Sequence, residues 1–232
     1  FDNTTRAYSV DLATYVANEA KSISKIADIL NKSGEHLYWS VIYDRIKDSI
    51  NKNLYDEEDK FYYDKDVNTN EFIKVKTSSG FLPLFAGICE KRQAEDIVEN
   101  HLFNKEEFFT PFMIPSTAIN EESFENDMWR GCVFPYINYF VSLGLLDYGY
   151  KKEAMKIIND TVMNILNYYE NDGVIYEYYD PLRKTSPSRL KRKGESIFAY
   201  LPDVKLQPVR DFGVTASVCA QMILSSLKSN NE

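Results

Sequence analysis

Histidine is scarce in this sequence, and several common catalytic motifs are missing. The 232 residues include two histidines, His36 and His101, far apart and each within a predicted helix. This placement argues against a histidine-based metal centre or a serine–histidine relay. The sequence lacks the nucleotide-binding patterns G-x-G-x-x-G and G-x-x-x-x-G-K-[ST], so nucleotide sites of those kinds are not expected. It also lacks G-x-S-x-G, the pattern of the nucleophile elbow in α/β-hydrolases.

Cysteine is sparse, and long apolar runs and net positive charge are lacking. Cys89, Cys132 and Cys219 are widely spaced, which predicts reduced core residues and no disulfide framework. No apolar run approaches the ~20 residues that cross a membrane, and no signal peptide is visible. We therefore expect a cytoplasmic protein without a membrane partner, but Phe1 is not Met, which leaves open a targeting segment before it. The net charge of -8 argues against a nucleic-acid partner.

Aromatic and acidic side chains are plentiful. Seventeen Tyr, 14 Phe and two Trp make up 14% of the chain, beside 35 Asp and Glu. The aromatic residues fit either core packing or stacking on sugar rings, and composition alone leaves both open. Most of the carboxylates must be solvated charges on helix surfaces. The length is typical of one domain, and we predict a single catalytic domain over residues 1–232.

Apolar residues recur with the 3.6-residue helical period along most of the chain, which predicts an all-α fold. Gly34 is expected to end the first helix. Seven helices are predicted, at about residues 11–32, 39–54, 79–88, 91–103, 135–146, 151–169 and 211–227.

Short strand-like pieces and two long loops interrupt these helices. Residues 54–55 and 61–63 flank an acidic turn and predict a small hairpin, and residues 174–176 predict another strand. Residues 108–128 and 181–208 show no helical period. The second loop carries a run of basic residues that indicates either a solvated flexible loop or a lid that attracts an acidic substrate group. These residues are Arg183, Lys184, Arg189, Lys191, Arg192 and Lys193.

Three segments combine acidic, aromatic and polar residues outside the helical period. They are F-D-N-T-T-R at residues 1–6, M-W-R-G-C-V-F-P at 128–135 and G-V-I-Y-E-Y-Y-D-P at 173–181. In this order they resemble inverting glycosidases that include processing α-glucosidase I and bacterial mannosylglycerate hydrolases, and more distantly trehalases. Further similar segments lie at residues 77–84, 114–116, 138–149 and 211–216, so the resemblance covers nearly the whole chain.

The resemblance implies a fold, a mechanism and a set of site residues. It implies an (α/α)6 toroid, of which seven helices would form roughly the C-terminal half. It assigns Asp2 as general acid and Glu177 as general base, across a gap of ~6.5–9.5 Å that holds the attacking water. We expect substrate contacts from Asn3, Arg6, Trp129, Arg130 and Tyr179, with no metal or cofactor. An alternating strand would place Tyr179 on the same face as Glu177.

Departures from the family pattern bear on the substrate. Cys132 and Phe134 stand where Pro and Trp are common, and Val214 stands where Trp is common. The expected reaction is cleavage of an α-glucosidic or α-mannosidic bond. A trehalase-like disaccharide hydrolase and a non-catalytic carbohydrate-binding domain remain alternatives, with Asp2 then a helix-preceding cap and Glu177 a solvated residue. The apolar helix faces of half a toroid would need a preceding N-terminal segment or would drive self-association.

Overall fold

The helices follow one another as the sequence pattern predicts. The computed structural model describes residues 6–192 and 207–229. Within those residues it contains seven α-helices, which lie close to the seven predicted segments. Their bounds are α1 Val10–Ile29, α2 Ser33–Leu54, α3 Leu82–Ala86, α4 Lys91–Ile97, α5 Pro135–Asp147, α6 Lys151–Asp172 and α7 Gly213–Ser229. In this described part of the chain, no helix is long and apolar enough to cross a membrane.

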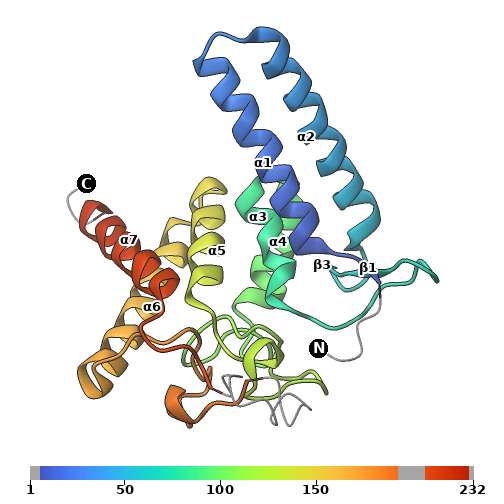
Figure 1. Cartoon of the computed structure of the whole chain (residues 1–232). Helices are drawn as coiled ribbons and strands as arrows, with labels where there is room; N and C mark the ends of the chain where they lie inside the picture. The colour runs from blue at the N-terminus through green and yellow to red at the C-terminus, as the bar shows by residue number, and fades with distance from the viewer. Residues whose placement is uncertain (1–5, 193–206, 230–232) are drawn as a thin grey trace, which may run out of the picture.

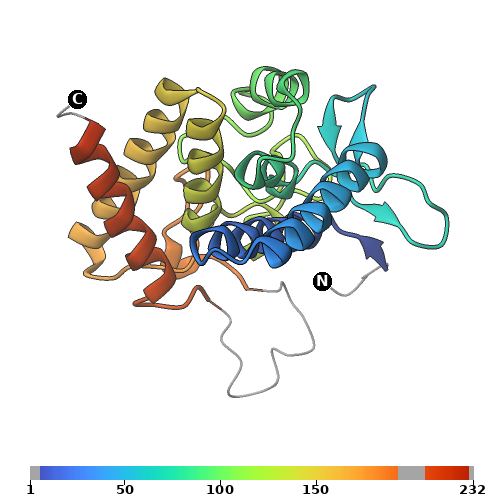
Figure 2. The same cartoon turned by 90° about the horizontal axis from the view of Figure 1, so that it is seen from above.

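Tighter or wider turns extend two of the short helices. The 3-10 turn η1, Ser78–Phe81, leads into α3, and the π-helical turn η2, Val98–Leu102, continues α4. Two more 3-10 turns lie in loops, η3 at Met128–Arg130 and η4 at Pro187–Arg189. α3 contacts both α1 and α5, and α5, α6 and α7 pack against one another on the side away from α2 (Figures 1 and 2).

Helices α1 and α2 form a long hairpin that projects from the rest of the molecule (Figure 1). The turn between them contains Asn31 in the left-handed conformation, with φ 56°. The N–H groups of Asn31 and Lys32 donate to the carbonyls of Asp28 and Ala27 at 2.9 and 2.8 Å. These bonds end α1 in a Schellman arrangement. The prediction that Gly34 ends this helix is wrong, because asparagine also tolerates the left-handed region and Gly34 lies in the first turn of α2.

The predicted hairpin around the acidic turn is confirmed. β2, Tyr55–Asp56, pairs antiparallel with β3, Phe61–Tyr62. The Asp56 carboxylate accepts the N–H groups of Glu58 and Asp59 at 2.8 and 2.9 Å, which shapes the turn.

A second strand pair was not expected, and one predicted strand is absent. β1, Ala7–Tyr8, pairs antiparallel with β4, Lys65–Asp66. Two-residue strands have no alternation for a sequence pattern to reveal. In the predicted strand 174–176, only Tyr176 makes an isolated bridge, to Arg210.

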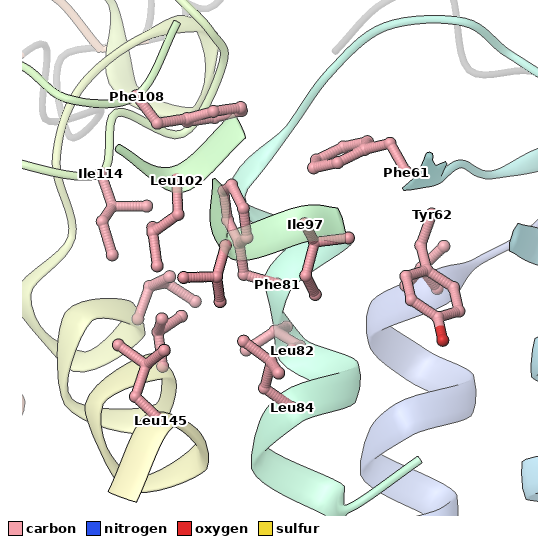
Figure 3. Close-up of a cluster of buried hydrophobic side chains, with 14 of the residues drawn as sticks. Phe61, Tyr62, Phe81, Leu82, Leu84, Ile97, Leu102, Phe108, Ile114 and Leu145 are labelled. Atoms are coloured by element: carbon pink, nitrogen blue, oxygen red, sulfur yellow. The ribbon is translucent and has the colours of Figure 1, made fainter. Parts of the chain in front are cut away.

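Aromatic rings fill the centre of the larger core (Figure 3). Phe61, Phe81 and Phe108 are fully buried, and the centroid of Phe81 lies 5.3 and 4.8 Å from those of the other two. Gly80 lies directly against the Phe61 ring, where no Cβ would fit. This core joins the β2–β3 hairpin to α3, α4 and the loop that follows η2. The three cysteines are buried and unpaired, as predicted.

His101 and Glu107 form a buried hydrogen-bonded pair beside this core. His101 Nδ1 lies 2.7 Å from Glu107 Oε2, and its Nε2 lies 2.8 Å from the carbonyl oxygen of Asp59. Lys76 Nζ donates to the other Glu107 oxygen at 2.8 Å. Both ring nitrogens of His101 therefore lie within hydrogen-bond distance of an oxygen atom. Burial alone would raise the pKa of Glu107, but the hydrogen bonds from His101 and Lys76 outweigh it and lower that pKa.

The contacts of Glu107 predict that the stability of the fold decreases at acidic pH. A carboxyl group with a lowered folded-state pKa stabilises the fold above its unfolded pKa, near 4.3, and that contribution is lost as the pH falls through the folded value. We expect the free energy of unfolding, measured in urea, to fall as the pH drops from 6 to 3. Glu107→Gln should be less stable at pH 7 and should show a shallower decline. An unchanged slope in Glu107→Gln would contradict this prediction, and Glu106→Gln, at an exposed neighbour, is the control.

The exposed surface of the α1–α2 hairpin is unusually apolar. Large hydrophobic side chains there are between 40% and 77% exposed. They are Leu12, Val16, Ile26, Ile29, Leu30, Leu37, Tyr38 and Val41. Apolar surface of this extent marks a place where another part of a protein packs.

Candidate active site

Isolated β-bridges draw distant loops together at one end of the helices (Figure 1). Val133 bridges both Pro115 and Tyr179, and Asp127 bridges Lys191. Two of the three motif segments of the sequence, around Trp129 and Glu177, therefore lie side by side. The first motif is described only from Arg6 onward, so Asp2 and Asn3 lie outside the described residues.

Two buried hydroxyls hold the turn that carries Trp129. Ser116 Oγ accepts the N–H of Gly131 at 2.9 Å and donates to the carbonyl of Met128 at 3.3 Å. Thr117 Oγ1 donates to the carbonyl of Trp129 at 3.2 Å. Gly131 has φ 145°, and a Cβ there would collide with the carbonyl oxygen of residue 125, so only glycine suits the turn. The sequence indicated Ser116 only as part of a motif, and the structure adds its contacts.

Trp129 belongs to an aromatic stack. Its indole lies parallel to the ring of Phe134, with centroids 3.7 Å apart and an interplanar angle of 11°. Tyr136 approaches the indole edge-on at 6.3 Å, and Tyr178 packs on Phe134 at 5.3 Å. Phe134 thus supplies an aromatic ring where the family pattern has tryptophan. The half-buried Trp129 is held in one orientation, as a stacking platform for a sugar requires.

Arg130 forms ion pairs within its own loop. Its Nη2 lies 3.1 Å from Asp127 Oδ2 and 3.2 Å from Glu125 Oε2. Asp127 is 1% exposed, and among the described residues its Oδ1 has no hydrogen-bond partner, nor does Arg130 Nε. Unpaired buried acceptors and donors are costly unless a ligand or water pairs with them. Sequence reasoning missed Asp127, although an acid two residues before the tryptophan was a visible signal.

Glu177 is a nearly buried carboxylate with a defined orientation. It is 7% exposed. The guanidinium of Arg192 and the N–H of Val209, the latter at 3.1 Å, both donate to Oε2. Within residues 6–192 and 207–229, Oε1 accepts no hydrogen bond. The backbone N–H of Glu177 also donates to the carbonyl of Val209 at 3.0 Å, so this residue is fixed at both its main chain and its side chain.

Tyr179 has a different environment from the one predicted. It is fully buried, and its hydroxyl accepts the N–H of Tyr176 at 3.0 Å. Its ring packs against Phe112 and Tyr168 in the second core cluster. The expected alternation with Glu177 is wrong, because residues 174–179 bend and form no regular strand. The burial favours a packing role, and contact of Tyr179 with a substrate stays a prediction.

Arg6 lies just before β1 and its side chain is exposed. Its carbonyl accepts the N–H of Val67 at 2.9 Å, which ties the start of the described chain to the β1–β4 pair. This hydrogen bond involves only the main chain of Arg6. Its contact with substrate therefore also stays a prediction.

Comparison with known proteins finds a family for this chain. The family model for the mannosylglycerate hydrolase MGH1-like glycoside hydrolase domain matches residues 1–195. Mannosylglycerate hydrolase from Thermus thermophilus is 35% identical over 131 residues, which cover 56% of this chain and 30% of that protein. A cytosolic neutral trehalase from Kluyveromyces lactis is 29% identical over 157 residues, covering 66% of this chain and 21% of the trehalase.

Solved structures share the fold. The GH63 mannosylglycerate hydrolase from Thermus thermophilus, in complex with glucose, superposes with a TM-score of 0.66 and 28% identity. The match covers 76% of this chain and 42% of that one. Neutral trehalase Nth1 from Saccharomyces cerevisiae, at 17% identity and a TM-score of 0.64, shows the fold alone; the match covers 77% of this chain and 35% of the trehalase. The chain spans less than half the length of each of these relatives.

The fold and the loop cluster define a helical chain that forms part of an (α/α)6 toroid, as predicted. The chain belongs to the mannosylglycerate hydrolase MGH1-like glycoside hydrolase domain family.

Proposed function

We propose that the protein containing this chain is an inverting glycoside hydrolase and that Glu177 is its general base. The observation that carries the proposal is the environment of Glu177. A nearly buried carboxylate has one oxygen held by two donors, within the loop cluster that presents Trp129. Such fixed geometry at a charged group is a property of catalytic sites.

The proposed reaction needs one proton donor and one acceptor. Glu177 takes a proton from water, and the water oxygen attacks the anomeric carbon as the glycosidic C–O bond breaks. Asp2 gives its proton to the departing oxygen, so atoms and charge balance over the step. Trp129, Arg130, Asn3 and Arg6 are the proposed sugar contacts, by stacking and by hydrogen bonds to hydroxyl groups. The unpaired Oδ1 of Asp127 and Nε of Arg130, within the described part of the chain, support a polar subsite beside Trp129.

The proposed substrate is an α-mannoside or α-glucoside with an acidic aglycone such as glycerate. Three cations of the second loop support an acidic group in the substrate. The side chains of Arg183, Lys184 and Arg189 are exposed there and could attract a negative charge. The Thermus thermophilus relative is named a mannosylglycerate hydrolase, which supports the same class. Neutralising Arg183, Lys184 and Arg189 without any change in affinity for acidic glycosides would remove the aglycone from the proposal.

A second helical segment is the proposed occupant of the apolar α1–α2 surface. The matched relatives are more than twice as long as the aligned region, and the exposed leucine, valine and isoleucine side chains would pack in the closed ring. Self-association through this surface is the alternative, and sedimentation of the complete protein separates the two. A cytoplasmic location remains part of the proposal.

Product stereochemistry tests the reaction. A panel of α-mannosides, α-glucosides and trehalose should be incubated with the protein, and the anomer of each first-formed sugar followed by NMR. We expect a β-anomeric product from an α-glycoside with a glycerate-type aglycone. Release of the α-anomer would contradict the mechanism. Preference for trehalose would favour the trehalase-like alternative, and binding without turnover would favour a carbohydrate-binding domain.

A further inference from the structure

We propose that Arg192 is a positioning residue for Glu177. The Arg192 guanidinium holds one carboxylate oxygen of Glu177, so that the other carboxylate oxygen faces the reacting water. The inference rests on the proposed function, because it gives Arg192 a role relative to Glu177 as base. It separates Arg192 from the other basic residues of its loop, which the sequence presented as one run.

The geometry around Glu177 supports different roles for its two carboxylate oxygens, one held by the protein and one open to water. Arg192 and the Val209 N–H both donate to Oε2, and within the described residues Oε1 has no donor. The Arg192 side chain is 21% exposed and that of Glu177 is 9% exposed, so solvent screens the pair only weakly. Arginine stays charged and offers donors in a fixed plane, which suits it to orienting a carboxylate.

The backbone that leads into Arg192 is anchored to the site at Lys191, by two contacts. Lys191 bridges Asp127, next to the Trp129 turn. The hydroxyl of Tyr178 donates to the carbonyl of Lys191 at 2.7 Å. The segment is therefore tied to the residue after Glu177 and to the loop before Trp129. Arg192 is placed by these anchors, whereas Arg183, in the same loop, has an exposed side chain.

Two tyrosines of the described chain interact electrostatically with Glu177. Tyr136 and Tyr178 lie nearby, and burial raises the pKa of both, so both hydroxyls are neutral at the pH values of interest. Asp127 is paired with Arg130. Among the described residues, Arg192 is the cation within ion-pair distance of Glu177. The charge balance of the base should therefore respond to Arg192 more than to any other cation in the described chain.

Steady-state kinetics test this role. An orienting residue acts on the chemical step, so Arg192→Gln should lower kcat by about tenfold and leave KM near the wild-type value. Arg192→Lys keeps the charge and a donor and should restore most of the lost kcat. Arg45→Gln removes the same charge from an exposed position on α2 and should leave kcat and KM unchanged.

Each result bears on the inference separately from the proposed function. If Glu177→Gln retains hydrolysis, the proposed function itself fails. If Glu177→Gln is inactive and Arg192→Gln keeps the wild-type kcat, only the role of Arg192 fails. A rise in KM for acidic glycosides with kcat unchanged would make Arg192 a substrate contact and would overturn the positioning role.

Discussion

Replacing Glu177 with glutamine should reduce kcat for glycoside hydrolysis by about 10³-fold while sugar binding is retained. Glutamine keeps the shape of the side chain and an oxygen that can accept the Val209 N–H, but it cannot take a proton from water. The loss should fall on kcat, because the sugar contacts proposed at Trp129 and Arg130 are untouched. Initial rates measure the loss, and titration calorimetry with the product sugar measures binding.

A matched surface change separates chemistry from general disturbance. Glu170 lies in the last turn of α6, and its side chain is exposed. Glu170→Gln makes the same chemical change and should hydrolyse substrate at the wild-type rate. Thermal melting of both variants shows whether the fold is intact. Activity of Glu177→Gln within tenfold of wild type would remove Glu177 as the base.

Alanine at Gly144 should destabilise the fold by about 3 kcal/mol. Gly144 lies in α5 where this helix crosses α3, and a Cβ there would lie 2.6 Å from the carbonyl carbon of Leu84 and from the nitrogen of Phe85. Both atoms are backbone, so relief requires the two helices to separate. α3 also carries Leu84 into the main core (Figure 3), so the cost spreads to that packing.

Gly34 provides the control for this substitution. It also lies in a helix, but a Cβ there would meet nothing within 4 Å. Gly34→Ala should leave the free energy of unfolding unchanged or raise it by up to about 1 kcal/mol, since alanine favours the helix more than glycine does. Urea unfolding of the two variants measures the difference. Equal stability of the two would show that α3 and α5 are not in close contact.

The helices and one hairpin were predictable because their signals are local. The 3.6-residue period marks a buried stripe wherever a helix packs on a core, and seven such stripes correspond to the seven helices of the described residues. Helix ends were less predictable. Asn31 and Gly34 are both acceptable stop residues, and the choice between them depends on where the chain must turn to bring α2 back along α1.

The site was only partly predictable, because its members lie far apart along the chain. Motif order drew attention to Trp129, Arg130 and Glu177. Nothing local indicates that Arg192, 15 residues after Glu177, would pair with it while Arg183 remains exposed. The position of Tyr179 could not be predicted for a similar reason. The sequence pattern predicts a strand where the backbone instead bends and buries Tyr179 in the core.

The sequence by itself determined the helical class, the order of the elements and the motif residues, because periodicity and motif spacing are properties of neighbouring residues. Tertiary structure alone decided which carboxylate oxygen of Glu177 is held, which cation holds it, and which hydroxyls, those of Ser116 and Thr117, fix the Trp129 turn. Those choices depend on distances between segments that meet only after the helices have packed.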